Sequence, residues 1–111
     1  MLAKANRVTT GDDYRSAVRR GRRFVGANTV TYVRSRTEGD DVRFGFIVAK
    51  NVGAAVHRNR VRRRLKAASA GLLTAAPLRA DIVIRALPGS SEASWDTLRS
   101  EVEDSVSRAK S

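Results

Sequence analysis

The sequence contains no cysteine, which excludes a disulfide framework, a thiol nucleophile and a thiolate metal site. No apolar run approaches the ~18 residues that a membrane-spanning helix requires. The opening residues, MLAKANRVTTG, lack the apolar stretch of a secretory signal. These absences predict a soluble protein that works in the cytoplasm.

Acidic residues are scarce and unevenly placed. The chain has 11 Asp and Glu against 22 Lys and Arg, a formal net charge of +11. No acidic residue occurs between Val42 and Ala80, whereas residues 91–111 hold more acids than bases. A field of this strength attracts polyanions, most often nucleic acid and sometimes an anionic membrane face. Because the charge is polarised, the sequence predicts one basic face.

The 111 residues predict a single α+β domain, 1–111, with residues 1–9 as a basic N-terminal arm. Apolar periodicity and turn residues predict the order α-β-β-β-α-β-α, with a mixed sheet of about four strands and helices mainly on one face. The expected helices cover about 11–20, from the middle fifties to about 75, and a final segment after Ser94; the expected strands cover 22–25, 29–36, 42–50 and 80–87.

Several local features carry finer expectations. Thr10 and Ser94 are expected to cap the first and last helices, and Gly21 to end the first helix in a left-handed conformation. Glu38-Gly39-Asp40 predicts a hairpin turn into strand 42–50, and Pro77 is expected to end the second helix. Strand 42–50 is apolar on both faces after Arg43, which favours a central place in the sheet.

The chain is organised around residues 50–72, where a strand end, a glycine-containing loop and an arginine-dense helix follow one another. Val61, Leu65, Ala68 and Leu72 recur at helical spacing and predict one buried stripe. The other positions point away from that stripe: Arg58 and Arg62 on one shoulder, Arg60 and Arg64 on the other, and Asn59, Arg63 and Lys66 outward. Like charges at three- and four-residue spacing repel, so phosphate contact is the preferred interpretation over a solvated face.

Other residues near this helix allow two interpretations each. Asn59 could make a specific polar contact or be an ordinary surface residue, and Gly53 could expose helix amides to an anion or only permit a turn. Tyr14 and Tyr32 could stack on unpaired bases or pack between the first helix and the sheet. Trp95 continues an apolar helical stripe and is expected in the core.

The sequence gives little support for catalytic residues. His57 is the only histidine, it lies among arginines, and no serine is tied to it by the pattern. Asp12 and Asp13 are typical of a helix cap, and Asp40 and Asp41 of a turn, so neither pair predicts a metal site. The sequence predicts a binding protein without catalytic or metal-ligating residues of its own.

The run from Lys50 to Lys66, KNVGAAVHRNRVRRRLK, resembles the signature of the bacterial ribonuclease P protein subunit. In that family a lysine-containing strand end and a Gly-Asn-Ala-Val type of loop precede Arg-Asn-Arg and an apolar-basic pattern. Arg58-Asn59-Arg60 carries the resemblance here, which extends over nearly the whole chain through Asn6-Arg7-Val8, the first helix, strand 80–87 and the final helix.

The resemblance implies a fold and a function. The family joins parallel strands through the Arg-Asn-Arg helix with a left-handed crossover, against the usual rule, in a ribosomal-protein-like RNA-binding architecture. Its catalytic component is an RNA that uses Mg²⁺ to remove the 5′ leader of precursor tRNA. The protein binds that RNA, one chain to one RNA, and holds the single-stranded leader in a central cleft; no organic cofactor is implied.

The resemblance also implies roles for residues. The RNA-binding set comprises Arg58, Asn59, Arg60, Arg62, Arg63 and Lys66, to which we add the neighbouring cations Lys50 and Arg64. Tyr14, Val18 and Tyr32 fall at the positions of the leader cleft. Val18 stands where the family often has Phe, which removes a stacking surface. Ala54 replaces the loop Asn and Asn51 a second Lys, which removes polar groups from that loop.

Two other functions compete with this one. A ribosomal-type RNA-binding protein of similar architecture would use the same basic helix and would co-purify with ribosomes. A protein-only nuclease that uses His57 would cleave RNA without any RNA partner.

Overall fold

The computed structural model of the chain describes residues 2–39, 41–74 and 79–110. The order of helices and strands is the expected one. The elements are η1 Lys4–Asn6, α1 Gly11–Arg20, β1 Arg22–Val25, β2 Thr29–Ser35, β3 Arg43–Ile47, η2 Lys50–Val52, α2 Ala55–Ala70, β4 Ala80–Ala86, η3 Pro88–Ser91 and α3 Trp95–Ala109. None of the helices in this described part is long and apolar enough to span a membrane.

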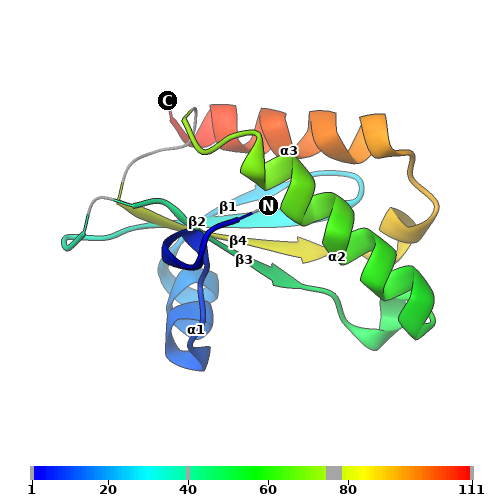
Figure 1. The fold of residues 1–111 in the computed structure, drawn as a ribbon, viewed down its shortest axis with the longest axis horizontal. Coiled ribbons are helices and arrows are strands. Elements are labelled where there is room, and N and C mark those ends of the chain that lie inside the picture. The colour runs from blue at the N-terminus through cyan, green and yellow to red at the C-terminus, as the bar shows by residue number, and fades with distance from the viewer. Residues whose placement is uncertain (1, 40, 75–78, 111) are drawn as a thin grey trace.

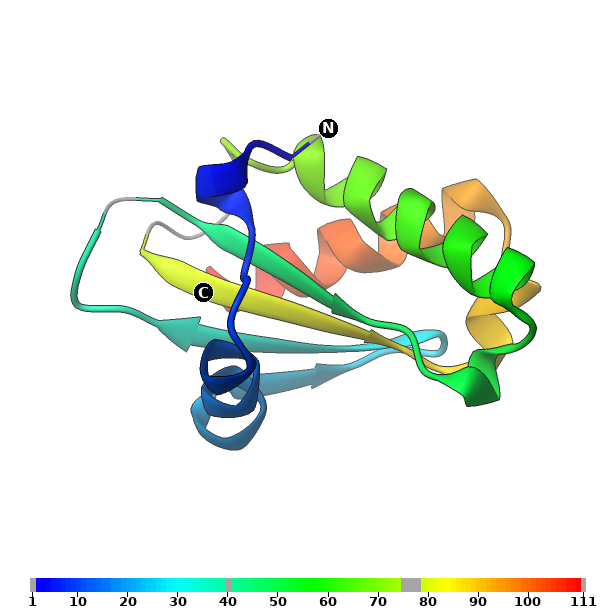
Figure 2. The ribbon, with the colours of Figure 1, turned by 60° about the horizontal axis from the view of Figure 1, so that its bottom comes forward.

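The four strands form one mixed sheet in the order β1-β2-β4-β3. The β1–β2 and β2–β4 pairs are antiparallel, and β3 and β4 are parallel. Helix α2 connects the two parallel strands, and Figures 1 and 2 show that this crossover has the left-handed sense. The mixed sheet and the uncommon crossover, which the family resemblance implied, are confirmed.

The expected hairpin between the second and third strands is wrong. β2 and β3 are not neighbours, because β4 lies between them and pairs with both. β4 takes the central place because Ile82, Val83 and Ile84 are fully buried, so both faces of the strand are covered. β3 is therefore not central, and Asp40 of the expected turn lies outside the described residues.

The basic N-terminal arm packs along β3. Arg7 forms a parallel bridge with Phe44, and the Val8 amide donates to the Phe44 carbonyl at 2.8 Å. Leu2 and Val8 are buried. The arm therefore covers the outer edge of β3, where no named strand flanks it, and pairs with part of that edge.

Helices α2 and α3 cover one face of the sheet, and α1 covers the other (Figures 1 and 2). The main core lies between the sheet and α2 and α3, and includes Phe44, Leu65, Ile82 and Val102. A smaller core lies under α1; it contains Ala17, Val30, Tyr32 and Val83, with Tyr14, Val18, Ile47 and Leu87 packed against it. The prediction of helices mainly on one face holds for α2 and α3.

The caps were predicted more accurately than the helix ends. The Thr10 side chain accepts from the Asp13 amide at 3.2 Å, and the Ser94 side chain from the Thr97 amide at 3.1 Å. Gly21 is extended, with φ −73° and ψ 158°, so the expected left-handed stop is wrong. A side chain there would place its Cβ 2.4 Å from the Ala17 carbonyl oxygen, so glycine is needed for space.

Two expectations about helix content need correction. α2 ends at Ala70, with Gly71 as its C-cap, rather than near 75, and Pro77 lies outside the described residues. Trp95 is not in the core: 37% of it is exposed, although Leu98 and Val102 on the same helix are fully buried. Trp95 is the first residue of α3, and it lies beside α2 instead of over the sheet.

Candidate nucleic-acid interface

Helix α2 presents its cations because the sequence buries only one stripe of it. Val61, Leu65 and Ala68 are buried against the sheet, which directs the intervening residues outward. Gly53, with φ 146°, makes the turn from η2 into this helix, in a conformation that other residues rarely adopt. The helix begins after this turn, so its position relative to β3 is fixed by the loop.

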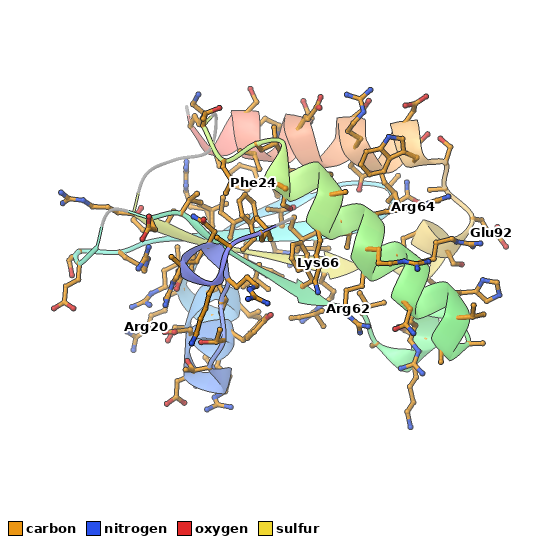
Figure 3. All side chains as sticks on the ribbon, viewed as in Figure 1. Arg20, Phe24, Arg62, Arg64, Lys66 and Glu92 are labelled. Atoms are coloured by element: carbon orange, nitrogen blue, oxygen red, sulfur yellow. The ribbon has the colours of Figure 1, made fainter. Side chains whose placement is uncertain are left out.

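The structure brings the predicted RNA-binding set together along α2, with Lys50 in the turn that precedes it. Lys50, Asn59, Arg63 and Lys66 are exposed, and Arg58, Arg60, Arg62 and Arg64 are half-buried. In Figure 3, Arg62 and Lys66 lie on the side of α2 away from α3, and Arg64 on the side toward α3. The set forms one continuous cationic surface; its contact with RNA stays a prediction.

Two arginines of this surface are held by backbone oxygens. Arg60 donates to the Ser91 carbonyl at 2.9 Å, and Arg64 donates to the Ala93 carbonyl at 3.0 Å. A neutral carbonyl fixes a guanidinium group without cancelling its charge. On the other shoulder, Arg62 donates to the Asn59 side-chain oxygen at 3.1 Å, so Asn59 orients a neighbouring cation.

The carboxylates of α3 do not neutralise α2. Asp96 and Glu103 pair with Arg99, and Asp104 pairs with Arg108, all within α3. Glu101 instead binds the turn between β1 and β2. Among residues 2–39, 41–74 and 79–110, no cation of α2 forms an ion pair with a carboxylate.

The residues of the expected leader cleft also meet, on the opposite face of the sheet. Tyr14 and Val18 of α1 pack on the cluster that contains Tyr32. The Tyr14 ring lies directly over Gly45, and the Phe46 amide donates to the Tyr14 hydroxyl oxygen at 3.1 Å. Tyr14 is therefore fixed in position by the sheet and half-exposed at its edge.

Tyr32 is covered. Only 6% of it is exposed, and the Arg85 guanidinium carbon lies 5.6 Å from the centre of its ring. A groove of about 270 Å³ beside it is lined by Tyr14, Arg15, Val18, Arg19, Ile47 and Arg85. The groove therefore presents an arginine where sequence reasoning expected a tyrosine. The alternation of strand 80–87 placed Arg85 on the face of Val83, which was the available signal.

Sequence reasoning also missed a buried ion-pair network at the other end of the sheet. Asp81 is fully buried and accepts from Arg43 through both oxygens at 2.7 Å, with Arg36 at 3.1 Å. The hydrogen bond to Asp81 raises the pKa of the Arg43 guanidinium. Arg43 also lies 3.2 Å from Asp13. These arginines are charged like those of α2 but are held by carboxylates, so they serve the fold.

Comparison with known proteins agrees with this geometry. The sequence model of the ribonuclease P family matches residues 2–110. The ribonuclease P protein component of Clavibacter michiganensis subsp. michiganensis is 53% identical over 109 residues, which cover 98% of this chain and 96% of that protein. The corresponding protein of Pseudarthrobacter chlorophenolicus is 46% identical over 103 residues, which cover 93% of this chain and 76% of that protein.

Solved structures show the same fold. The ribonuclease P protein of Staphylococcus aureus superimposes with a TM-score of 0.85 at 24% identity, covering 96% of this chain and 97% of that one. The ribonuclease P protein of Thermotoga maritima superimposes with a TM-score of 0.82 at 22% identity, and the match covers 92% of this chain and 96% of that one. Since the family model spans nearly the whole sequence and the two relatives exceed 40% identity, the chain belongs to the ribonuclease P protein family.

Proposed function

We propose that the chain acts in ribonuclease P by binding the catalytic RNA along α2 and the 5′ leader of precursor tRNA along the groove beside α1. Membership of the family makes the chain the protein component of a ribonucleoprotein endoribonuclease that matures the 5′ end of tRNA. The RNA subunit and precursor tRNA are its partners in that reaction. In this proposal one protein chain serves one RNA in the cytoplasm.

The observation that carries the proposal is the unpaired charge of α2. Its cations stand at three- and four-residue spacing, where like charges repel, and the carboxylates of α3 are engaged elsewhere. Phosphates of an RNA would supply the missing negative charge and release counterions. Such binding weakens steeply as salt is added.

The chemistry of cleavage is assigned to the RNA subunit and the Mg²⁺ that it binds. The described residues contain no group of three or more His, Asp or Glu side chains placed to hold a metal ion. The His57 Nδ1 atom lies 3.3 Å from an Arg60 nitrogen. Among the described residues, the hydrogen-bonding neighbour of this imidazole is an arginine and not a serine or a carboxylate. The protein's contribution is to bind and orient RNA.

The groove beside α1 supports the leader assignment through its shape and charge. Val18 and Ile47 form its apolar floor, while Arg19 and Arg85 are exposed at its rim. One face of the Arg85 guanidinium group lies over the Tyr32 ring. The other face of the guanidinium group is then open to a base or a phosphate of a single strand. The groove thus offers arginine stacking where Val18 removes aromatic stacking.

A comparison of Arg85→Ala with Arg85→Lys tests the leader groove. We expect Arg85→Ala to weaken binding of leader-containing precursor about tenfold by the reconstituted holoenzyme, because stacking on an unpaired base is worth about 1–3 kcal/mol. Arg85→Lys keeps the positive charge but lacks the planar guanidinium group that stacks on a base. It should therefore restore only part of the affinity that Arg85→Ala loses. Binding of mature tRNA, which has no leader, is the control and should not change.

The result also separates the two halves of the proposal. Equal losses for precursor and mature tRNA would remove the leader from this groove while leaving the binding of α2 to RNA intact. Cleavage by the purified chain without RNA would instead favour a nuclease centred on His57.

A further inference from the structure

Trp95 is an exposed aromatic residue at the start of α3. It is 37% exposed, whereas Leu98 and Val102 on the same helix are fully buried. Trp95 follows the N-cap Ser94, so helix geometry fixes its backbone. A large aromatic side chain held at the surface by a regular helix is a preformed contact area.

Arginines of α2 surround this indole. Trp95 lines a depression of about 290 Å³ together with Arg60, Arg63, Arg64 and Ala67. Arg60 and Arg64 are fixed by the Ser91 and Ala93 carbonyls, as described above. Arg63 is exposed and makes no hydrogen bond or ion pair with the residues that the structure describes.

The acidic residues near the depression leave its charge in place. Asp96, next to Trp95, pairs with Arg99 at 3.6 Å. Glu92 lies in the segment before α3, and in Figure 3 it points outward, away from α2. The depression therefore combines an apolar aromatic surface with uncompensated positive charge.

This combination suits an unpaired nucleobase. A base stacks on the indole whatever its identity, because every base has a π-face, and its flanking phosphate pairs with a guanidinium group. A second copy of this chain is a poor occupant, since each copy has a formal charge of +11 and would bring the same sign of charge.

The position of the depression selects between the two RNAs of the holoenzyme. It lies at the junction of α2 and α3, on the face of the sheet opposite to α1 and its groove (Figure 1). It is continuous with the cationic surface of α2, because Arg60, Arg63 and Arg64 belong to both. An occupant of the depression would therefore extend from the RNA that lies along α2.

We infer that Trp95 stacks on an unpaired nucleobase of the RNA subunit and that Arg63 binds the phosphate beside it. The inference rests on the proposed binding of that RNA along α2. It adds α3 to the interface and assigns a role to the residue that the sequence pattern had placed in the core.

Replacement of the indole gives the first test, with the full chain and the ribonuclease P RNA transcript. Trp95→Ala should weaken RNA binding roughly 5- to 100-fold, which corresponds to the loss of one stacked base. The salt dependence of binding should stay unchanged, because no charge is removed. Trp95→Phe should recover most of the affinity, because phenylalanine also stacks. Arg63→Ala should both weaken binding and lower the salt slope by about one charge.

A matched control and a folding check accompany these variants. Val25→Ala truncates another exposed apolar residue, on β1 at the far edge of the sheet, and should leave RNA affinity within twofold. Thermal unfolding of each variant separates lost binding from lost folding. Should Trp95→Ala unfold, Trp95→Leu keeps an apolar side chain without a π-face, and it should show the same loss of affinity.

Fluorescence gives a second readout, because Trp95 is the only tryptophan of the chain. Binding of the RNA subunit should quench its emission and protect it from acrylamide. Quenching by leader-containing precursor alone, without the RNA subunit, would overturn the choice of RNA. Unchanged emission together with normal RNA binding by Trp95→Ala would overturn the stacking site while leaving the role of α2 intact. Failure of the unmodified chain to bind the RNA would remove the proposed function itself.

Discussion

Helices α2 and α3 pack side by side on the same face of the sheet, yet their outer surfaces are built differently. α2 buries Val61 and Leu65, and α3 buries Leu98 and Val102, so both contribute to one core. The outward residues of α2 are cations without acids, whereas α3 carries acids and bases that pair with each other. Surface charges that serve only the fold can be arranged like those of α3, in pairs of opposite sign.

The difference has an energetic meaning. Each like-charge pair at three- or four-residue spacing on α2 destabilises the helix by about 0.2–0.5 kcal/mol, whereas opposite-charge pairs on α3 stabilise it by similar amounts. Stability alone would not retain the α2 pattern. The comparison predicts that changes in the carboxylates of α3 act on folding, while changes in the cations of α2 act on RNA binding.

The largest expected effect is a loss of stability on removal of Glu101, the carboxylate of α3 that binds the turn between β1 and β2. Glu101 accepts hydrogen bonds from the Asn28 amide at 3.1 and 3.2 Å and from the buried Thr29 hydroxyl. Glu101→Ala leaves these donors without an acceptor and should lower the free energy of unfolding by about 2–4 kcal/mol. Urea denaturation measures it, and the RNA affinity of the folded variant should not change.

Glu103→Ala is the matched control on the same helix. Glu103 pairs with Arg99 at 3.0 Å on the surface, where both side chains are nearly half exposed. Its removal should cost only about 0.3–0.5 kcal/mol. Equal losses for the two variants would mean that Glu101 does not fasten the turn between β1 and β2.

The fold was predictable from sequence where local chemistry determines it. The Thr10 and Ser94 caps located the starts of α1 and α3, and Pro88 follows the end of β4. The neighbours of a strand are not local information. Strands β2 and β3 are separated by turn residues, which suggested a hairpin, but the apolar strand at Ile82–Ile84 takes the place between them.

The candidate site was predictable to the extent that helical periodicity determines it. The pattern placed Arg60 and Arg63 on the surface of α2, but it could not show that Arg60 is fixed by the Ser91 carbonyl and Arg63 is not. The contact of Arg43 with Asp81 joins residues 38 positions apart, and the exposure of Trp95 depends on where α3 begins relative to α2. Such contacts follow from topology.

A smaller effect is expected when one cation is removed from each helix. Arg63→Ala should weaken binding of the ribonuclease P RNA about tenfold and lower the slope of log affinity against log salt concentration by about one. It should also reduce cleavage of precursor tRNA, chiefly at low Mg²⁺. Arg108→Ala removes the same charge from α3, at the end of the helix away from Trp95, and should leave RNA affinity within twofold. Filter binding over a salt series measures both. Equal losses would mean that net charge, and not its position on α2, governs RNA binding.

The last expected change in stability is small, has the opposite sign, and tests the comparison most directly. Asn59→Glu places a carboxylate four residues before Arg63 and three before Arg62, the arrangement that α3 uses. We expect the free energy of unfolding to rise by about 0.3–0.5 kcal/mol, because the new charge relieves repulsion. RNA affinity should fall severalfold, because the same carboxylate competes with phosphate for the arginines.

Ser100→Glu supplies the control for Asn59→Glu, because it makes the same change in net charge on α3. The new carboxylate would stand four residues from both Asp96 and Asp104, so stability should fall slightly and RNA affinity should hold. A gain in stability joined to a loss of RNA binding is therefore expected only on α2. If Asn59→Glu raised stability and left RNA binding unchanged, the cations of α2 would be a solvated surface, and the contrast between the two helices would have no functional meaning.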